Sequence, residues 1–262
     1  METKNYQSTK EYYNKVAEYR ATTFLQGWVG EIAKRRVLPA INVLIFDKNK
    51  KEKWLDMGCA SGFNLDLGIK FNNPDADIYG IDIAENNIKL AKQRLKKHNP
   101  NLQLGNVENL PFKNNMFDKV TYLHVIEHVV NPVKSLKELK RVLNDNGVAC
   151  ISFQNKYGLE TFLFDLTKKI VGYNKTKFGD TGGFNKGKKV LDKRRSIWEI
   201  KKMCDDVGLK IKRVDGCIVM LPSLAWRIPG IRKLTLFFSD ILQTLPIIKY
   251  LSSYINVTVV KE

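Results

Sequence analysis

Short apolar runs alternate with longer amphipathic segments through the middle of this 262-residue chain. The short runs have the length of buried strands, and the longer segments repeat apolar residues at helical spacing. In chain order, the pattern predicts strand 53–57, helix 63–71, strand 78–83, helix 85–97, strand 102–104, strand 117–123, helix 132–143 and strand 148–153. This alternation is typical of a parallel, doubly wound sheet with right-handed crossovers.

The two ends of the chain follow other patterns. Residues 6–20 and 28–46 have the spacing of amphipathic helices, and Pro39 favours a bend in the second. The later segments predicted are helix 159–171, a Gly- and Lys-rich loop at 172–189, helix 197–207 closed by Gly208, strand 209–214, an apolar stretch at 221–250 and strand 254–260.

An acidic residue and a turn of small residues follow the first predicted strand. Asp56 is succeeded by Gly58, Cys59, Ala60 and Gly62. Ligands bind beyond the carboxyl ends of the strands in open parallel sheets, and glycine lets the backbone approach a ligand closely. The helix that follows offers free N–H groups and a positive dipole end to a carboxylate. Asp56 supplies negative charge that favours a ligand with a sulfonium and an amino acid group.

Asp82 ends the second predicted strand, and Ile83 follows it. A carboxylate at this point accepts two hydrogen bonds from a ribose diol, and its spacing from the glycine turn suits a nucleoside. The alternative is that Asp82 caps the helix that begins near Glu85.

With these motifs the sequence resembles the class I S-adenosylmethionine-dependent methyltransferases. That family carries an acidic–x–Gly–x–Gly–x–Gly motif here, and this chain has Ala60 at the middle glycine. Residues 105–112 (GNVENLPF) and 115–118 (NMFD) resemble its "GDAENLPF…SFD" segment. The resemblance covers roughly residues 50–155. The dinucleotide pattern GxGxxG is absent, which disfavours NAD.

The resemblance implies a donor site for S-adenosylmethionine, with S-adenosylhomocysteine as product. Asn106 would accept a hydrogen bond from the adenine amino group, in place of the usual acidic residue. Val107 would donate its backbone N–H to an adenine ring nitrogen, and Glu108 would lie on the same side of the donor pocket. The predicted cofactor-binding residues are Asp56, Gly58, Cys59, Ala60, Gly62, Asp82, Ile83, Asn106, Val107, Glu108 and His124.

The segment 124–128 (HVIEH) has two interpretations. It matches the HxxEH pattern of inverted zinc peptidases, but Pro132 excludes a long helix and a strand precedes the motif, so we expect no metal site. It also resembles the "HVLEHV" stretch of the methyltransferases. On that interpretation His124 lies along the donor pocket, and Glu127 or His128 is the catalytic residue that orients or deprotonates an acceptor hydroxyl. The alternative is that His128 only caps or packs the short helix.

The expected fold is α/β and Rossmann-like, with about seven strands that are mostly parallel and an antiparallel last strand. We expect one integrated domain: a helical cap at 1–50, a donor-binding core at 51–155, and an acceptor-side insertion with completion of the sheet at 156–262.

The net charge of +17 and the sequence pI of about 9.6 indicate attraction to polyanions. RNA, an anionic membrane and a phosphorylated substrate all fit, and a lysine-rich proteome is the alternative explanation. The four cysteines form no CxxC pair, the first residues are not apolar, and no run of about 18 apolar residues occurs. We therefore expect a cytoplasmic protein, with peripheral membrane contact as an option.

The acceptor side is less specific in sequence. The loop at 178–184 has the composition of a lid, and the stretch at 221–250 combines basic residues with Trp226, Phe237 and Phe238. These features favour a small-molecule acceptor that is amphipathic or phosphorylated, such as a lipid, a quinone precursor or a lipid-linked sugar. An RNA methyltransferase and a non-catalytic, membrane-associated binding protein are the alternatives, the former without a recognisable RNA-binding module.

Overall fold

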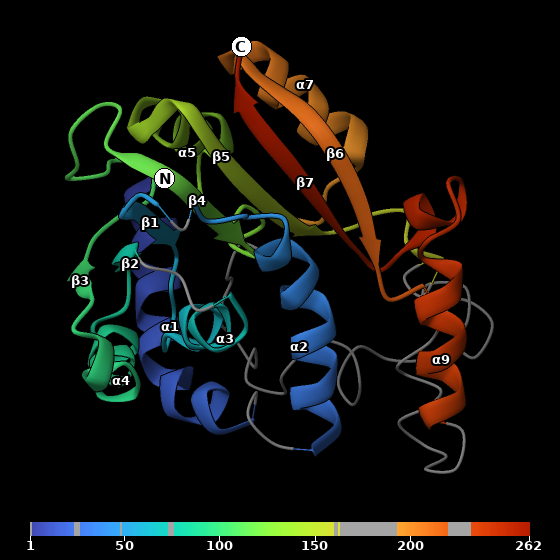
Figure 1. Cartoon of the computed structure of the whole chain (residues 1–262). Coiled ribbons are helices and arrows are strands. Elements are labelled where there is room, and N and C mark those ends of the chain that lie inside the picture. The colour runs from blue at the N-terminus through green and yellow to red at the C-terminus, as the bar shows by residue number, and fades with distance from the viewer. Residues whose placement is uncertain are drawn as a thin grey trace.

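A seven-stranded sheet runs through the molecule, with helices on both faces (Figure 1). The computed structural model describes residues 2–23, 27–47, 49–72, 76–159, 162, 193–219 and 232–262. The strands are β1 (Glu52–Met57), β2 (Ala76–Asp82), β3 (Asn101–Leu104), β4 (Phe117–Leu123), β5 (Leu143–Gln154), β6 (Leu209–Cys217) and β7 (Tyr254–Lys261). The helices are α1 (Glu2–Thr23), α2 (Gly27–Asn42), α3 (Phe63–Asn72), α4 (Glu85–Arg94), α5 (Pro132–Val142), α7 (Ile197–Val207) and α9 (Arg232–Leu242), with short 3-10 helices η1 (Lys96–His98) and η3 (Ile248–Leu251).

The strand order is β3-β2-β1-β4-β5-β7-β6, as the alternating pattern predicts for a doubly wound sheet. All neighbouring pairs from β3 to β5 are parallel, whereas β7 is antiparallel to both β5 and β6. The predicted Rossmann-like fold with an antiparallel last strand is therefore confirmed. The carboxyl ends of β1, β2 and β4 lie side by side, so the polar residues that follow them meet at one edge.

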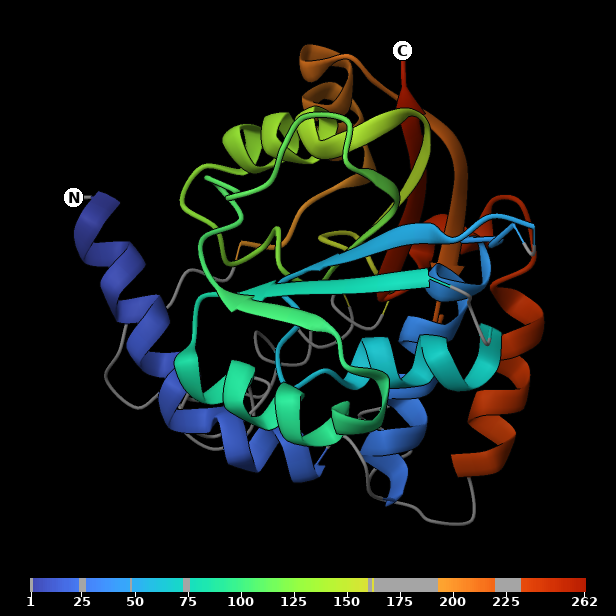
Figure 2. The same cartoon turned by 60° about the vertical axis from the view of Figure 1, so that its left-hand side comes forward.

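Two apolar layers hold the helices against the sheet. One face packs against α5 and α7, and the other against α2, α3 and α4 (Figure 2). Every residue of β4 is buried because this strand lies in the middle of the sheet and is covered on both faces. Trp54 of β1 is fully buried, and its ring fills the space that Gly68 of α3 leaves open.

Several boundaries shift from those that the sequence predicts. Helix α4 ends at Arg94, three residues early, and continues as η1 before Asn99 takes a left-handed conformation. Strand β5 begins at Leu143 rather than 148. Gly208 closes α7 with φ +74°, as predicted. The predicted helix at 159–171, the loop at 172–189 with its lid segment 178–184, and Trp226 lie outside the described residues, apart from the start of that helix and Phe162.

Candidate functional site

A cleft opens at the carboxyl ends of β1, β2 and β4. Its empty space, part of it open to solvent, is about 1170 Å³, which suits a ligand of nucleoside size or larger. The predicted residues that line it are Gly58, Cys59, Ala60, Asp82, Ile83, Asn106, Val107, Glu108, His124 and His128. Asp56, Gly62 and Glu127, also predicted, are not among its lining residues. Segments far apart in sequence are thus brought to one place.

The turn after β1 is fixed to β2 by its backbone. The N–H groups of Gly58 and Cys59 donate to the Ile81 carbonyl at 2.8 and 2.9 Å. Ala60 has φ +45°, a left-handed conformation that costs energy for a residue with a side chain. The Ala60 N–H donates to Oδ2 of Asp82 at 2.9 Å, which holds this turn against the second strand.

Asp82 is a buried carboxylate held by three donors. Besides the Ala60 N–H, the N–H of Ala84 and the amide of Asn87 donate to its Oδ1, at 2.9 and 3.0 Å. Burial raises the pKa of Asp82, and these hydrogen bonds oppose that rise. The N-cap of α4 is Ala84, so Asp82 does not cap the helix itself. Its lone pairs beyond these bonds face a cleft that it lines.

The two glycines of the turn make room for protein atoms. A Cβ on Gly58, whose φ is +80°, would lie 2.4 Å from Cγ2 of Val125. A Cβ on Gly62, with φ +75°, would lie 3.1–3.2 Å from Leu95 and Ala91 beside α4. Both positions need glycine for conformation and for packing. Their predicted contact with a donor stays a prediction.

Asp56 is fully buried beneath the turn. Its Oδ1 accepts a hydrogen bond of 2.7 Å from the Thr121 hydroxyl of β4, and its Oδ2 has no hydrogen-bond partner among the described residues. Burial raises the pKa of Asp56 to about 7. A buried carboxylate that lacks part of its hydrogen bonds is costly, and a positively charged ligand group that binds nearby stabilises it.

We expect the stability conferred by Asp56 to fall as pH rises. The folded chain holds a proton on this carboxyl up to about pH 7, whereas the unfolded chain releases it near pH 4. The contribution is therefore complete below pH 4 and is lost as pH rises through 7, with a slope of up to about 1.4 kcal/mol per pH unit. Urea unfolding of wild type and Asp56→Asn between pH 5 and 8 measures the difference, and parallel pH profiles for the two proteins would contradict it.

The wall that follows β3 is shaped by polar turns. Oδ1 of Asn106 accepts a hydrogen bond from the Glu108 N–H at 2.9 Å, and Oε1 of Glu108 accepts one from the Val130 N–H at 2.8 Å. Glu108 thereby ties the wall to the segment after β4. Asn106 retains its amide group and a second oxygen lone pair for a ligand.

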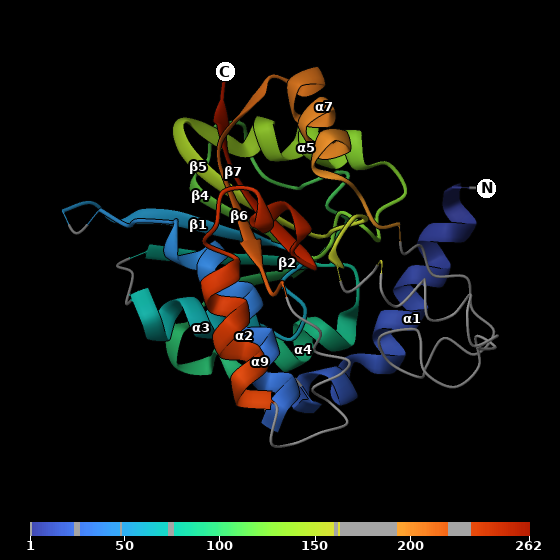
Figure 3. The ribbon, with the colours of Figure 1, turned by 90° about the vertical axis from the view of Figure 1, so that its right-hand side faces the viewer.

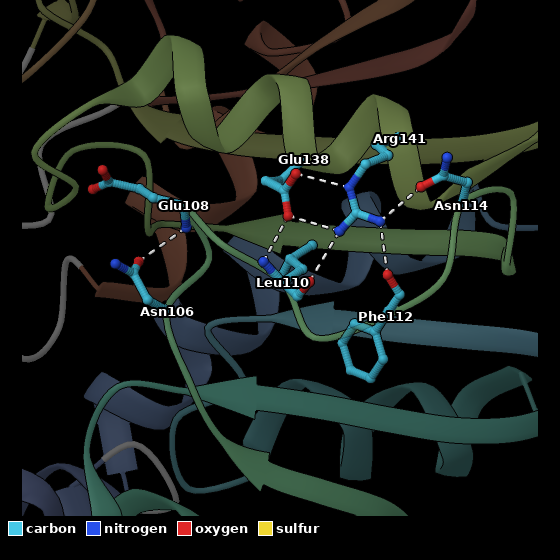
Figure 4. A network of polar contacts seen from close by, with 7 residues as sticks. All are labelled: Asn106, Glu108, Leu110, Phe112, Asn114, Glu138 and Arg141. Carbon is cyan, nitrogen blue, oxygen red and sulfur yellow. Dashed lines mark hydrogen bonds and ion pairs between the residues drawn. The ribbon is translucent and has the colours of Figure 1, made fainter.

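Two charged residues of α5 hold the next part of this loop (Figure 4). Arg141 donates to the carbonyls of Leu110 and Phe112 at 2.9 and 2.7 Å and to the side chain of Asn114 at 2.9 Å. Glu138 pairs with Arg141 at 2.7 Å, and its Oε2 accepts a hydrogen bond from the Leu110 N–H. Glu138 and Arg141 together hold residues 110–114. This also fixes Asn106, at the start of the loop, relative to the sheet.

Arg141→Ala is expected to weaken binding of S-adenosylhomocysteine about tenfold without preventing folding. The substitution removes three hydrogen bonds to the loop, each worth about 1 kcal/mol. Part of this lost free energy is expected to appear as weaker binding, because Asn106 is then held less firmly. Calorimetry measures the affinity. Arg213→Ala, which breaks an exposed pair with Asp215, is the matched control. Equal affinity in wild type and Arg141→Ala would show that the loop holds its position alone.

The 124–128 motif forms a turn after β4 rather than a helix. His124 has φ +56°, and its Nε2 lies 3.0 Å from the Ser152 hydroxyl of β5. Burial lowers the pKa of His124 to about 4, so its ring is neutral at pH 7. No group of three or more metal-ligating side chains occurs among the described residues. Because the motif is a turn, it does not present two histidines on one face of a helix, as a zinc peptidase requires.

Glu127 points into the protein. It is 3% exposed, its Oε1 accepts a 2.6 Å hydrogen bond from the Gln154 N–H, and the same oxygen lies 3.7 Å from Nδ1 of His124. These contacts fix the turn to the end of β5. His128 by contrast lines the cleft, and its ring meets that of Tyr13 edge-on at 5.7 Å.

Helices α1 and α2 supply a third wall that the sequence patterns did not identify as a site. Its residues are Tyr6, Thr9, Tyr13, Ala17 and Arg20 of α1, with Ala33, Arg36 and Val37 of α2. Hydrogen bonds between Asn14 and Asn86 and from Arg94 to the Ala21 carbonyl hold α1 on α4. The amphipathic spacing of residues 6–20 was the available signal, and it predicted a helix but no site.

Known proteins share both the sequence core and the fold of this chain. Residues 55–151 match the model of a methyltransferase domain. An uncharacterised protein of Methanocaldococcus jannaschii is 29% identical over 78% of this chain and 68% of its own length. The 2-phytyl-1,4-naphtoquinone methyltransferase of Trichormus variabilis is 35% identical over 37% of this chain and 44% of its own. The magnesium protoporphyrin IX methyltransferase of Synechocystis, solved with bound S-adenosylhomocysteine, superposes with a TM-score of 0.62 at 17% identity, over 97% of this chain and 98% of its own.

Proposed function

We propose that this chain, whose residues 55–151 match the model of a methyltransferase domain, is a class I S-adenosylmethionine-dependent methyltransferase that transfers the methyl group to a small, largely apolar acceptor. The observation that carries the proposal is that two different sets of residues line one cleft. The polar set follows β1, β2 and β3, and a set rich in tyrosine and aliphatic side chains comes from α1 and α2. The sequence match covers under half of the length of the naphthoquinone methyltransferase. The acceptor is therefore our inference and is not taken over from that protein.

The polar half of the cleft fits S-adenosylmethionine. The carboxylate of Asp82 suits the ribose hydroxyls, and the amide of Asn106 with the apolar Val107 suits adenine. Ser61, Phe63 and Asn64 line the cleft where α3 begins, so the positive end of that helix is available to the donor's carboxylate. The partly unsatisfied Asp56 lies beneath the turn as a source of negative charge.

The other half fits a flat or chain-like apolar acceptor. Tyr6, Tyr13 and Val129 provide ring faces and aliphatic surface. Arg20 and Arg36 each add a positive charge. The naphthoquinone methyltransferase named above acts on a molecule of this kind. We infer a quinol or similar amphipathic acceptor, which has an apolar body and a hydroxyl that can be deprotonated.

The chemistry requires placement more than strong catalysts. The bound donor supplies an electrophilic methyl group on a sulfonium. Holding the acceptor in line with that group contributes roughly 7–11 kcal/mol in well-arranged systems. His128 is our candidate base, because it lines the cleft next to Tyr13. It takes the proton that the acceptor loses as the new bond to the methyl group forms. Glu127 and the neutral His124 position the turn that carries it.

Transfer of label from methyl-tritiated donor tests the acceptor class. The protein is incubated with a short-chain naphthoquinol kept reduced, with catechol as a polar phenol, and with total RNA. We expect label in the naphthoquinol fraction, and none when Asp82→Ala replaces the wild type. Label in RNA alone would establish the RNA methyltransferase instead, and label in the catechol fraction alone would exclude the apolar acceptor.

A further inference from the structure

Helix α9 turns an apolar face away from the protein. Leu234, Phe237, Phe238 and Ile241 recur at helical spacing, and each is roughly half exposed. The rings of Phe237 and Phe238 meet edge-on at 5.8 Å. Leu245, Ile247 and Leu251, which follow the helix in the chain, are exposed as well, and Ile247 is 81% exposed. We call these seven residues the α9 face. Exposed apolar residues grouped in this way usually mark a site that contacts another protein or a membrane.

The rotation of α9 is fixed by polar contacts on its other side. Ser239 is buried, and its hydroxyl accepts a 3.0 Å hydrogen bond from the Val219 N–H. Gln243 accepts one of 3.0 Å from the Ile218 N–H. Asp240 pairs with Arg35 of α2. Because these three residues bind the protein, the apolar face cannot turn inward without breaking their bonds.

The segment of sequence that carries this face has an excess of positive charge, which favours an anionic partner. Asp240 is the sole acidic residue in the sequence from Cys217 to Lys261, and its charge is matched by Arg35. The same stretch contains Arg227, Arg232, Lys233 and Lys249. An apolar helix face in a segment with excess positive charge is typical of helices that lie on anionic lipid surfaces.

We infer that the α9 face docks on the surface of an anionic lipid bilayer. No helix among the described residues is long and apolar enough to cross a membrane, so the contact is parallel to the surface. Helix α9 is joined to α2 by the Asp240–Arg35 pair and lies in front of it in Figure 3. Arg36 and Val37 of α2 line the cleft. Docking would therefore bring the cleft within one helix of the lipid. The inference holds whether or not the acceptor is itself a lipid.

Vesicle sedimentation tests the docking with matched variants. The full-length protein is mixed with vesicles of phosphatidylglycerol and phosphatidylcholine, or of phosphatidylcholine alone. Phe237→Ser is compared with Phe71→Ser, because both rings are 59% exposed and Phe71 lies on α3. Ile247→Ser is compared with Ile45→Ser, both 81% exposed. We expect each α9-face variant to weaken vesicle binding about tenfold and each control to leave it unchanged. Binding is expected to fall in 0.5 M salt and to be weaker without phosphatidylglycerol.

Three outcomes would overturn the inference. They are no binding to anionic vesicles, equal loss in both members of each pair, and a dimer in light scattering that Phe237→Ser dissociates. The last would assign the face to a second copy of the chain. Binding of S-adenosylhomocysteine is measured in parallel and is expected to be unchanged in all four variants. A loss of vesicle binding is thereby distinguished from failure of the proposed methyl transfer.

Discussion

Asp82→Ala is expected to weaken S-adenosylhomocysteine binding by about a hundredfold or more. The change would remove the two proposed hydrogen bonds to the ribose, each worth about 1.5–3 kcal/mol when the acceptor is charged. It also leaves the Ala60 N–H and the Asn87 amide without their acceptor. The turn at 58–60 would then lose one of its bonds to β2, while those from the Gly58 and Cys59 N–H groups to the Ile81 carbonyl would remain. Both effects act on the same ligand, so this substitution has the largest consequence for donor binding.

Calorimetry with S-adenosylhomocysteine measures the loss, and thermal unfolding reports whether the fold survives. Asp77→Ala is the matched control, because Asp77 lies at the other end of β2 in an exposed pair with Lys51. Asp82→Asn separates the two effects: its oxygen can still accept from one backbone N–H, but the charge is gone. Donor affinity retained in a folded Asp82→Ala protein would refute the proposed ribose contact.

His128→Asn is expected to lower kcat about a hundredfold while leaving the donor's affinity within twofold. The imidazole lines the cleft beside Tyr13, and removal of a positioned base typically costs a factor of 10² to 10⁴. Asparagine keeps a similar size and polarity but cannot take up a proton. The effect applies to an acceptor that loses a proton, such as a phenol.

The pH dependence of the rate separates a base from a packing residue. A base in the reaction makes the wild-type rate depend on pH, and the variant is expected to lose this dependence. His98→Asn, in the exposed η1, is the control for general effects of removing a histidine. An unchanged pH profile with a reduced rate would make His128 a packing partner of Tyr13, as the alternative interpretation of the sequence had it.

The local patterns determined most of the secondary structure and the order of the binding motifs. Strand β4 was predicted at its observed bounds, and all seven of its residues are buried although Asp118, Lys119 and Thr121 are among them. The turn from Asp56 to Gly62 was recognisable because its backbone demands small residues in left-handed conformations. Parallel strands end at the same edge, so the sequence also predicted that Asp82 and the 58–60 turn would meet.

What each side chain contacts was decided by the tertiary structure alone. Glu127 and His128 are adjacent in the chain, yet one is buried against β5 and the other lines the cleft. Gly62, in the turn before α3, serves packing against Ala91 of α4. The tyrosines of α1 reach the cleft only because α1 docks on α4, about seventy residues away in sequence. Periodicity reports which face of an element is apolar, but the partner of that face depends on long-range packing that no local pattern contains.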